Sequence, residues 1–264
     1  MSRLGAGAVL AVLVVASVAL APLLTPYDPI APNYRNLYAL PSLAHPLGTD
    51  GLGRDVLARS LAGGRVSLGV AISATLLASL LGASLGTVAT GIGGAADTVL
   101  ARLFDAVLAF PGFLLVLLVV TILGGGALQT VLAMGVAGAP LYFRLARAYT
   151  RAELTTDYAL AGTALGATRR RLLWRHALPN FVGSLWVQAA STAASFLLIE
   201  ASLSYLGLGV PLPTPSWGNV LQDARSYLTQ QPWAAVGPGL FLAAASLAFQ
   251  FLSDGLRDRL DRRA

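Results

Sequence analysis

Lysine and cysteine are absent from this chain of 264 residues, and only two histidines occur, His45 and His176. Without lysine there is neither a phosphate-binding loop that ends in Gly-Lys-Ser/Thr nor a Schiff-base amine. Without cysteine, disulfides, thiolate nucleophiles and cysteine-ligated metals are excluded. The two histidines lie far apart in the sequence. We therefore expect that the chain does not hydrolyse ATP itself and carries no metal or other cofactor.

Charge is also scarce. Charged residues make up 11% of the chain and hydrophobic residues 56%, whereas a soluble domain has about 25% charged residues. The formal net charge of +6 is carried by arginine alone, because all 18 basic residues are arginines. The composition predicts an integral membrane protein. Arginines on the cytoplasmic side of the membrane explain its net positive charge better than nucleic-acid binding does.

Six apolar stretches approach the roughly 20 residues that a helix needs to cross a hydrocarbon core of about 30 Å. They lie near residues 4–24, 66–92, 104–123, 127–147, 181–203 and 234–252. The first follows Arg3 and lacks a clear small-residue cleavage site, so we interpret it as an uncleaved span rather than a signal peptide. Pro111 should kink the third. The prediction is an all-α polytopic membrane protein with six transmembrane helices.

The distribution of arginine orients these spans. With a cytoplasmic amino terminus, the outer loops near 25–65 and 204–233 hold five of the 18 arginines, and the inner segments hold the others. Both termini are then cytoplasmic. Because no internal repeat is visible, we expect one membrane domain, with an amino-terminal helix and outer segment at 1–65 and a five-helix core at 66–264. The core contains a long inner loop at 148–180.

A polar interruption, DYALAGTALGATRRRLLWRHALP, occupies residues 157–179 within that loop. Thr155 or Thr156 can cap a short helix that has Asp157 in its first turn and ends at Gly166. Thr168 can cap a second helix. Four positions at helical spacing form a narrow apolar stripe suited to insertion into a groove: Tyr158, Ala161, Gly162 and Leu165. The segment is either a docking element or a plain surface hairpin that obeys the positive-inside rule.

The glycine-rich outer segment at 48–55 fits neither a phosphate-binding loop nor an EF-hand. We interpret it as turns and an entry cap for a helix at 56–61. The arginines around that helix, Arg54, Arg59 and Arg65, predict that it is amphipathic and lies at the outer interface.

Three further side chains are candidates for pathway or structural roles. Acids at membrane depth are costly and are usually paired or line a polar path. For Glu200 and Asp105 a structural role, such as pairing with arginine or, for Glu200, capping the 204–218 loop, stands beside a pathway role. We expect Trp217, which follows a proline-rich stretch, to be exposed, either in a platform for a binding protein or as an interfacial anchor.

Residues 157–179 resemble the cytoplasmic coupling loop, or EAA motif, of ABC importer permeases. Ala161, Gly166 and Leu178-Pro179 match that motif, whereas Leu160 stands where Glu is expected and Gly162 where the second Ala is expected. Four more segments resemble the second permease subunit of the dipeptide, oligopeptide and nickel branch: HPLGTDGLGRDVLARSLAGGRVSLGVA, FDAVLAFPGFLL, EASLSYLGLGVPLPTPSWGNVL and SDGLRDRLDRR. The resemblance covers nearly the whole chain from about residue 27.

This resemblance implies a type I ABC importer permease fold in a bacterial or archaeal inner membrane. Its implied partners are a homologous permease that completes a heterodimer, two ATPases that bind ATP and Mg, and an extracytoplasmic binding protein. The implied ATPase-coupling residues are Asp157, Tyr158, Ala161, Gly162, Leu165, Gly166, Arg169, Leu178 and Pro179.

Di- or oligopeptides are the leading substrate class, and nickel or another small solute is the alternative. Two other classes of protein remain open. A secondary transporter or channel without ATPases should carry several intramembrane ionisable residues or a repeat. An intramembrane enzyme needs clustered His, Asp, Glu or Ser on facing spans.

Overall fold

The computed structural model describes residues 3–261, without the side chains at 170, 176–178, 180 and 261. Over this range the elements are helices, and no strand occurs. The helices are α1 (Arg3–Ala19), α2 (Ala21–Leu24), α3 (Val56–Ile92), α4 (Gly94–Leu108), α5 (Gly112–Leu123), α6 (Ala127–Leu154), α7 (Asp157–Ala164), α8 (Arg169–Leu172), η1 (Leu173–Ala177), α9 (Leu178–Tyr205), α10 (Trp217–Arg225) and α11 (Trp233–Asp261). The all-helical prediction is confirmed.

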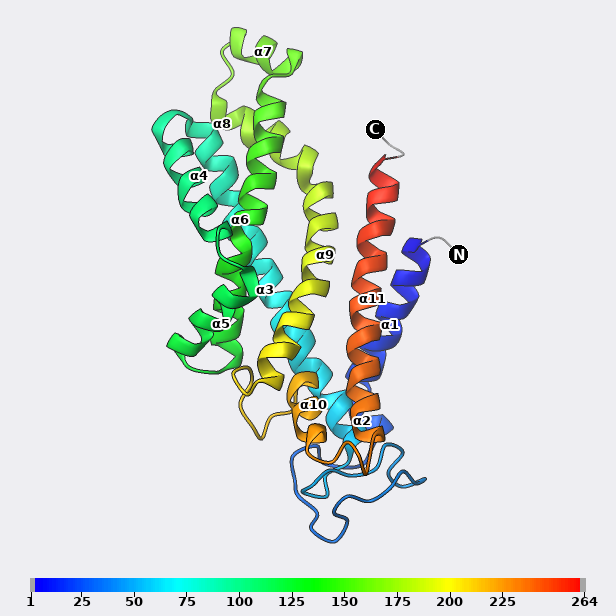
Figure 1. Cartoon of the computed structure of the whole chain (residues 1–264). Helices are drawn as coiled ribbons and strands as arrows, with labels where there is room; N and C mark the ends of the chain where they lie inside the picture. Colours follow the sequence, from blue (N-terminus) through cyan, green and yellow to red (C-terminus); the bar gives the residue numbers. More distant parts are fainter. Residues whose placement is uncertain (1–2, 262–264) are drawn as a thin grey trace.

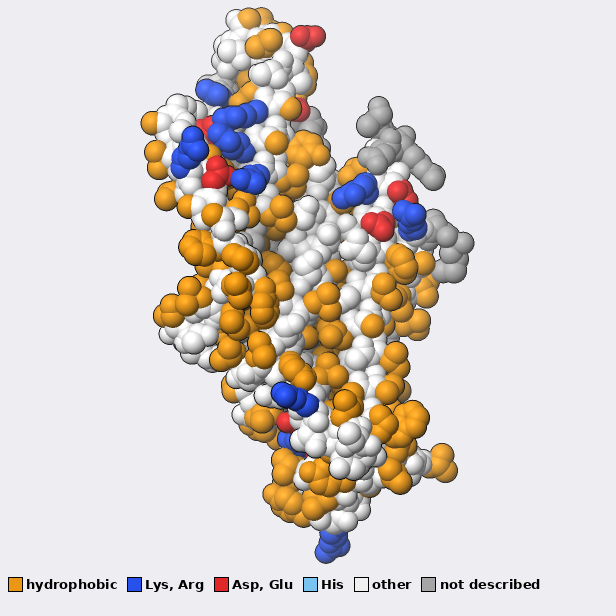
Figure 2. Space-filling model, viewed as in Figure 1, with side chains coloured by type: hydrophobic (Ala, Val, Ile, Leu, Met, Phe, Trp, Pro, Cys, Tyr) orange, Lys and Arg blue, Asp and Glu red, His pale blue; other side chains and the backbone are white. Residues whose placement is uncertain are grey.

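The long helices lie along the axis of an elongated molecule (Figure 1). Both termini, α7 and α8 gather at one end, and α10 and the segment that precedes α3 lie at the other. In Figure 2, hydrophobic side chains cover the middle of the visible face, while basic side chains cluster below α7, over α4, α6 and α8, and again near the carboxyl-terminal end of α11. This distribution is that of a membrane protein with two polar ends.

Small residues bring α3 and α6 together. A Cβ added at Gly82 would lie 2.2 Å from the carbonyl oxygen of Ala139, and one at Gly86 would lie 2.5 Å from that of Phe143. Only glycine at these positions permits such an approach of two backbones, which is a common way to pack membrane helices. The α3–α6 pair therefore forms the centre of the fold, with α9 against α3 and α11 against α9.

Among the residues that the structure describes, three helices have the length and apolarity to cross a membrane: α3, α9 from Phe181, and α11 as far as Leu260. The pair α4 and α5 gives a fourth if it is counted as one broken span. The first apolar stretch forms the shorter helix α1, of 17 residues. Six spans therefore stay a prediction.

The bend expected at Pro111 is confirmed, whereas the expectation of one continuous helix over 104–123 is wrong. Instead, α4 and α5 meet at an angle of 90° around Pro111. Proline lacks the N–H that a continuing helix requires, and it disfavours helical geometry at Phe110, the residue before it. At the other end of α4, Gly93 and Gly94 have φ angles of +74° and +60° and separate it from α3. Residues 93–103, which lie between the second and third predicted spans, are therefore largely helical.

The expectation of a separate interfacial helix at 56–61 is also wrong, because these residues form the first turns of the continuous helix α3. The entry cap itself is confirmed: Asp55 Oδ1 accepts a hydrogen bond from the amide of Ala58 at 2.7 Å. Asp50 Oδ1 accepts from the amides of Leu52 and Arg54, as expected for an Asx-type turn.

Candidate functional site

Helix α7 is the outermost element at the end that carries both termini (Figure 1). Thr156 occupies its N-cap position, but its hydroxyl donates to the carbonyl of Glu153 rather than capping the helix. Gly166 has a φ of +87° and ends the helix as predicted. Its amide donates to Thr163 O and the amide of Ala167 donates to Gly162 O, the two bonds of a Schellman motif.

Two buried leucines in α8 and η1 pack against neighbouring helices. Leu172 lies beneath α7, where a Cβ added at Gly162 would be 3.5 Å from its Cδ2. Leu173 fills the space beside Gly91 of α3, where an added Cβ would be 2.3 Å from its Cδ1. The predicted second cap is confirmed, because Thr168 Oγ1 accepts from the amide of Arg171 at 3.3 Å. Helix α7 thus packs on Leu172, and the next residue, Leu173, packs on α3.

The outer surface of α7 is apolar and uncovered. Leu165 is 89% exposed and Leu160 58% exposed, with Tyr158 and Ala161 also on the surface. Gly162, the fourth member of the predicted stripe, is partly covered by its approach to Leu172. The stripe is therefore confirmed as a largely exposed apolar face.

The remaining residues predicted for this segment lie closer to the long helices. Arg169 Nη2 donates to the carbonyl oxygen of Thr90 in α3 at 3.5 Å, and Pro179 is exposed in the first turn of α9. The side chains of Leu178 and His176 lie outside the described residues.

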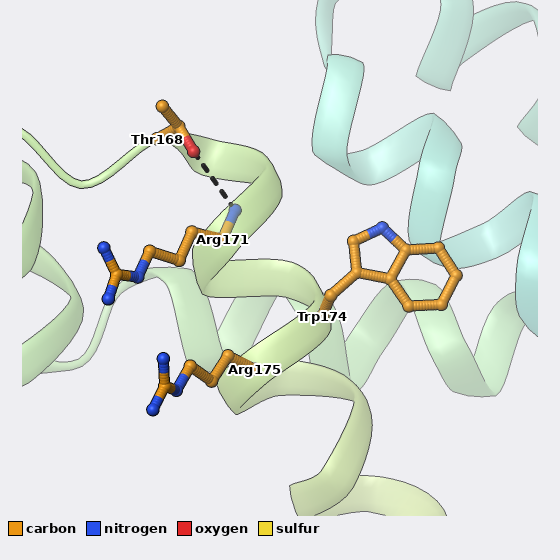
Figure 3. A pocket seen from close by; sticks show the side chains of 4 residues that line it. All are labelled: Thr168, Arg171, Trp174 and Arg175. Carbon is orange, nitrogen blue, oxygen red and sulfur yellow. Dashed lines mark hydrogen bonds between the residues drawn. The ribbon is translucent and has the colours of Figure 1, made fainter.

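A shallow pocket of about 480 Å³ lies over α8 and η1, lined by Thr168, Arg171, Trp174 and Arg175 (Figure 3). The guanidinium groups of Arg171 and Arg175 extend to the same side, and the indole of Trp174 points the other way. Among the side chains that the structure describes, no carboxylate forms an ion pair with either arginine. These two cations are free to meet a ligand or a partner.

Other arginines at this end join α6 to α4. Arg147 binds Asp97 through both carboxylate oxygens, at 2.7 and 2.9 Å, and Arg151 also bonds to Asp97. Arg144 Nη2 lies 2.6 Å from Asp105 Oδ1, with both side chains exposed. The structural alternative for Asp105, pairing with arginine, is thereby supported.

The expectation that Trp217 is exposed is wrong, because its side chain is completely buried. Ser216 and Asn219 form a capping box that starts α10 and turns the indole inward. Trp217 Nε1 donates to Ser60 O at 2.8 Å, and the ring stacks on Phe241 at 6.2 Å. Trp217 therefore serves neither as an exposed docking aromatic nor as an interfacial anchor.

A buried ion network at the outer end joins the segment before α3, the start of α3 and α10. Arg54 Nε lies 2.7 Å from Asp50 Oδ2, while Arg54 Nη2 and Arg59 Nη2 lie 3.1 and 2.7 Å from Asp223 Oδ2. Burial raises the pKa of the Asp223 carboxyl, whereas Arg59 and Arg54 favour its charged form. Sequence reasoning missed this network; its one local signal is the four-residue spacing of Asp50 and Arg54.

Glu200 is fully buried in α9, and among the described side chains no arginine forms an ion pair with it. Its Oε1 accepts from Ser204 Oγ at 2.8 Å, and that hydroxyl accepts from the amide of Val210 at 3.3 Å. Glu200 thus supports the loop after α9 through Ser204. Within the described part of the chain, no donor meets hydrogen-bond geometry at its Oε2. Among the described residues no three His, Asp or Glu side chains gather as metal ligands would.

Residues 74–264 match the family described as binding-protein-dependent transport system inner membrane component. The chain is 38% identical over 262 residues to the di/tripeptide transport system permease protein DppC of Pseudomonas aeruginosa, across 97% of this chain and 86% of that protein. It is 36% identical over 255 residues to the oligopeptide transport system permease protein OppC of Bacillus subtilis, across 97% and 84% of the two chains. It is 40% identical over 241 residues to the glutathione transport system permease protein GsiD of Pectobacterium atrosepticum, across 90% and 79%. The resemblance recognised in the motifs is confirmed: the chain belongs to this family of ABC transporter permeases.

Proposed function

We propose that the chain is a permease subunit of an ATP-driven, binding-protein-dependent importer of di- or oligopeptides. Membership of the permease family supports the transport role, and the names of the relatives support peptides over nickel or another small solute. In this proposal the chain crosses a bacterial or archaeal inner membrane six times, with both termini in the cytoplasm. It forms the pathway with a homologous permease and receives substrate from an extracytoplasmic binding protein.

The exposed apolar face of α7 carries the proposal that residues 157–179 dock an ATPase. Fully burying a leucine side chain contributes about 1.5–3 kcal/mol, so Leu160 and Leu165 would favour a partner that covers them. This face lies at the same end as the two termini (Figure 1), which is the cytoplasmic end in the proposed orientation. Because Leu160 replaces the Glu of the family motif, docking would rest on shape and apolar contact, with Arg169 and Arg171 as electrostatic support.

The packing of residues 157–179 supports the transmission of movement from the ATPases to the membrane helices. α7 follows α6 after a turn of two residues, Leu172 packs beneath α7, and Leu173 packs against α3. Closure of two ATPases around bound ATP and Mg would therefore move the long helices as well as α7. Such a movement would switch the pathway between inward-facing and outward-facing states. ATP hydrolysis would belong to the partners.

Charge on the docking face tests this proposal. Ala161→Asp and Leu165→Asp should each lower substrate-stimulated ATP hydrolysis of the reconstituted complex by about tenfold or more, because burying an unpaired carboxylate opposes docking. The amount of chain in the membrane should not change. Leu43→Asp is the matched control, because Leu43 is fully exposed and belongs to the outer segment.

The same preparation separates the competing classes of protein. Co-purification of ATPase with the solubilised wild-type chain, and its loss in the α7 variants but not in Leu43→Asp, supports docking. Normal transport by Ala161→Asp and Leu165→Asp would overturn the docking assignment. Transport by a complex that retains no ATPase would identify a secondary transporter instead.

A further inference from the structure

One face of α9 is polar along most of the thickness of a membrane. Five uncharged polar side chains share this face, and each is at least partly exposed: Ser184, Gln188, Ser191, Ser195 and Ser202. At about 3.6 residues per turn, their positions fall within about 60° of one another around the helix axis. The rise from Ser184 to Ser202 is about 27 Å, close to the roughly 30 Å of a hydrocarbon core. We call these five residues the α9 stripe.

The exposed faces of the other long helices are largely hydrophobic. Exposed side chains on them include Leu76 and Leu80 of α3, Leu132 and Val136 of α6, and Leu240 and Leu247 of α11. Such faces suit contact with lipid. Polar side chains at membrane depth are costly against lipid, and they face the interior of a helix bundle or a water-filled cavity. We therefore expect the α9 stripe to face protein or water.

Polar groups of α6, which lies beside α9 in Figure 1, approach the stripe. Ser184 Oγ donates to Tyr149 Oη at 2.8 Å, and Gln188 Nε2 donates to Thr192 Oγ1 at 3.3 Å. The hydroxyl of Tyr142, a fully buried residue of α6, lies beside Thr192. Within the described part of the chain, no group meets hydrogen-bond geometry at this hydroxyl. A buried polar group in this condition is costly unless water or a ligand reaches it.

The stripe offers hydrogen-bond acceptors without charge. Ser195 Oγ donates to Ser191 O at 3.3 Å, and Ser202 Oγ donates to Leu198 O at 2.8 Å. Each hydroxyl oxygen thus keeps its lone pairs for a donor outside the helix. Glu200, the one carboxylate in the sequence of α9, is buried on another side of the helix. The stripe itself carries no imidazole, thiolate or carboxylate with which to bind a metal ion such as nickel.

We propose that the α9 stripe lines the translocation pathway and accepts hydrogen bonds from backbone N–H groups of the transported peptide. This inference rests on the proposed import of peptides. Backbone N–H groups are common to peptides of any sequence, so an uncharged stripe admits acidic and basic peptides alike. A contact between two membrane helices is made largely by small and apolar side chains, whereas a hydrated path needs polar groups along its whole length.

Cysteine labelling tests whether the stripe meets water. The chain contains no cysteine, so Ser191→Cys and Ser195→Cys each introduce a unique thiol into a complex whose other subunits carry no accessible cysteine. In proteoliposomes these thiols should react with a charged, water-soluble methanethiosulfonate at least about tenfold faster than Val136→Cys, because a thiol in lipid does not ionise. Val136 is the matched control, since it is exposed on the hydrophobic face of the neighbouring helix α6.

Substrate links this labelling to transport. Excess peptide should slow the reaction of Ser191→Cys and Ser195→Cys, and the labelled complexes should lose ATP-driven peptide uptake. Labelling that peptide does not slow would overturn the proposed contact with substrate.

A second substitution narrows the path without adding charge. Ser195→Leu should lower uptake of a tripeptide about tenfold more than uptake of a dipeptide, because the added volume excludes the larger substrate. Val136→Leu adds bulk to the hydrophobic face of α6 and should import both peptides as the wild type does. Equal effects of Ser195→Leu on the two peptides would contradict a place in the pathway.

The outcomes separate this inference from the proposed function. If the complex imports peptide while Ser191→Cys and Ser195→Cys react no faster than Val136→Cys, the stripe is covered by protein or lipid and the pathway assignment alone is overturned. If the wild-type complex does not import peptide with ATP, the proposed function is overturned, and with it the substrate assigned to the stripe.

Discussion

The indole nitrogen of Trp217 donates a hydrogen bond to the backbone carbonyl of Ser60, 2.8 Å away and 157 residues earlier in the chain. The first residue of α10 is thereby held against the second turn of α3. Gly64 makes room for the ring, because a Cβ there would lie 2.9 Å from Trp217 Cζ2. The start of α10 at the outer end is therefore packed against α3 as part of the protein core.

Replacing Trp217 by alanine should destabilise the protein by about 3–5 kcal/mol, because it empties a large buried site. Trp217→Phe keeps much of the packing and loses the hydrogen bond to Ser60, which costs about 1 kcal/mol. Thermal unfolding of the purified protein in detergent measures both. Trp233→Ala is the control, since Trp233 is 52% exposed and should matter little. Equal melting temperatures for Trp217→Ala and Trp233→Ala would contradict the packing described for α10.

Removing Arg59 from the outer ion network should be strongly destabilising. Arg59→Gln leaves the buried carboxylate of Asp50 and the partly buried carboxylate of Asp223 with Arg54 alone, and breaking a buried ion pair in this way costs about 3–5 kcal/mol. Arg35→Gln, at an exposed position of the same outer segment, should leave stability unchanged.

A second substitution shows whether the loss comes from charge. Asp223→Asn in the Arg59→Gln background removes the excess negative charge and should recover part of the lost stability in a double-mutant cycle. If the two changes are simply additive, Arg59 stabilises the protein by packing and not through Asp223.

Glu200→Gln separates the structural and pathway roles of this buried acid. The amide oxygen of glutamine can still accept the hydrogen bond from Ser204, so stability should change by less than about 1 kcal/mol. Transport should also persist if Glu200 only supports the loop after α9. Loss of transport in a variant of normal stability would instead identify Glu200 as a pathway residue. Measuring uptake and thermal unfolding on the same preparation distinguishes these outcomes.

Local chemistry made part of the candidate site predictable. A glycine after a short helical pattern predicts a left-handed residue that ends the helix, and Gly166 has that conformation. The threonine at 168 and the aspartate at 55 cap the helices that follow them, as their positions indicated. In each case the bonding groups lie within a few residues of each other, so one sequence segment determines the result.

Contacts between distant segments were not predictable in the same way. The proline-rich stretch before Trp217 favoured an exposed aromatic, but the space beside Gly63 and Gly64 in α3 buries it. Likewise, the partners Arg59 and Asp223 are 164 residues apart, and nothing near either one identifies the other. At Pro111 the sequence predicted a bend but gave no angle, which depends on how α5 packs against α6.

Helix α6 runs without a break from Ala127 to Leu154, a length of about 42 Å for its 28 residues. Pro140 lies close to its middle and is the one proline inside it. Because α6 is continuous through Pro140, its two ends belong to one rod. A tilt of about 10° around Pro140 would shift each end by about 3–4 Å in opposite directions. Rocking α7 one way at the inner end would then displace the outer loop at Gly126 the other way, so one rotation would close one side while it opens the other.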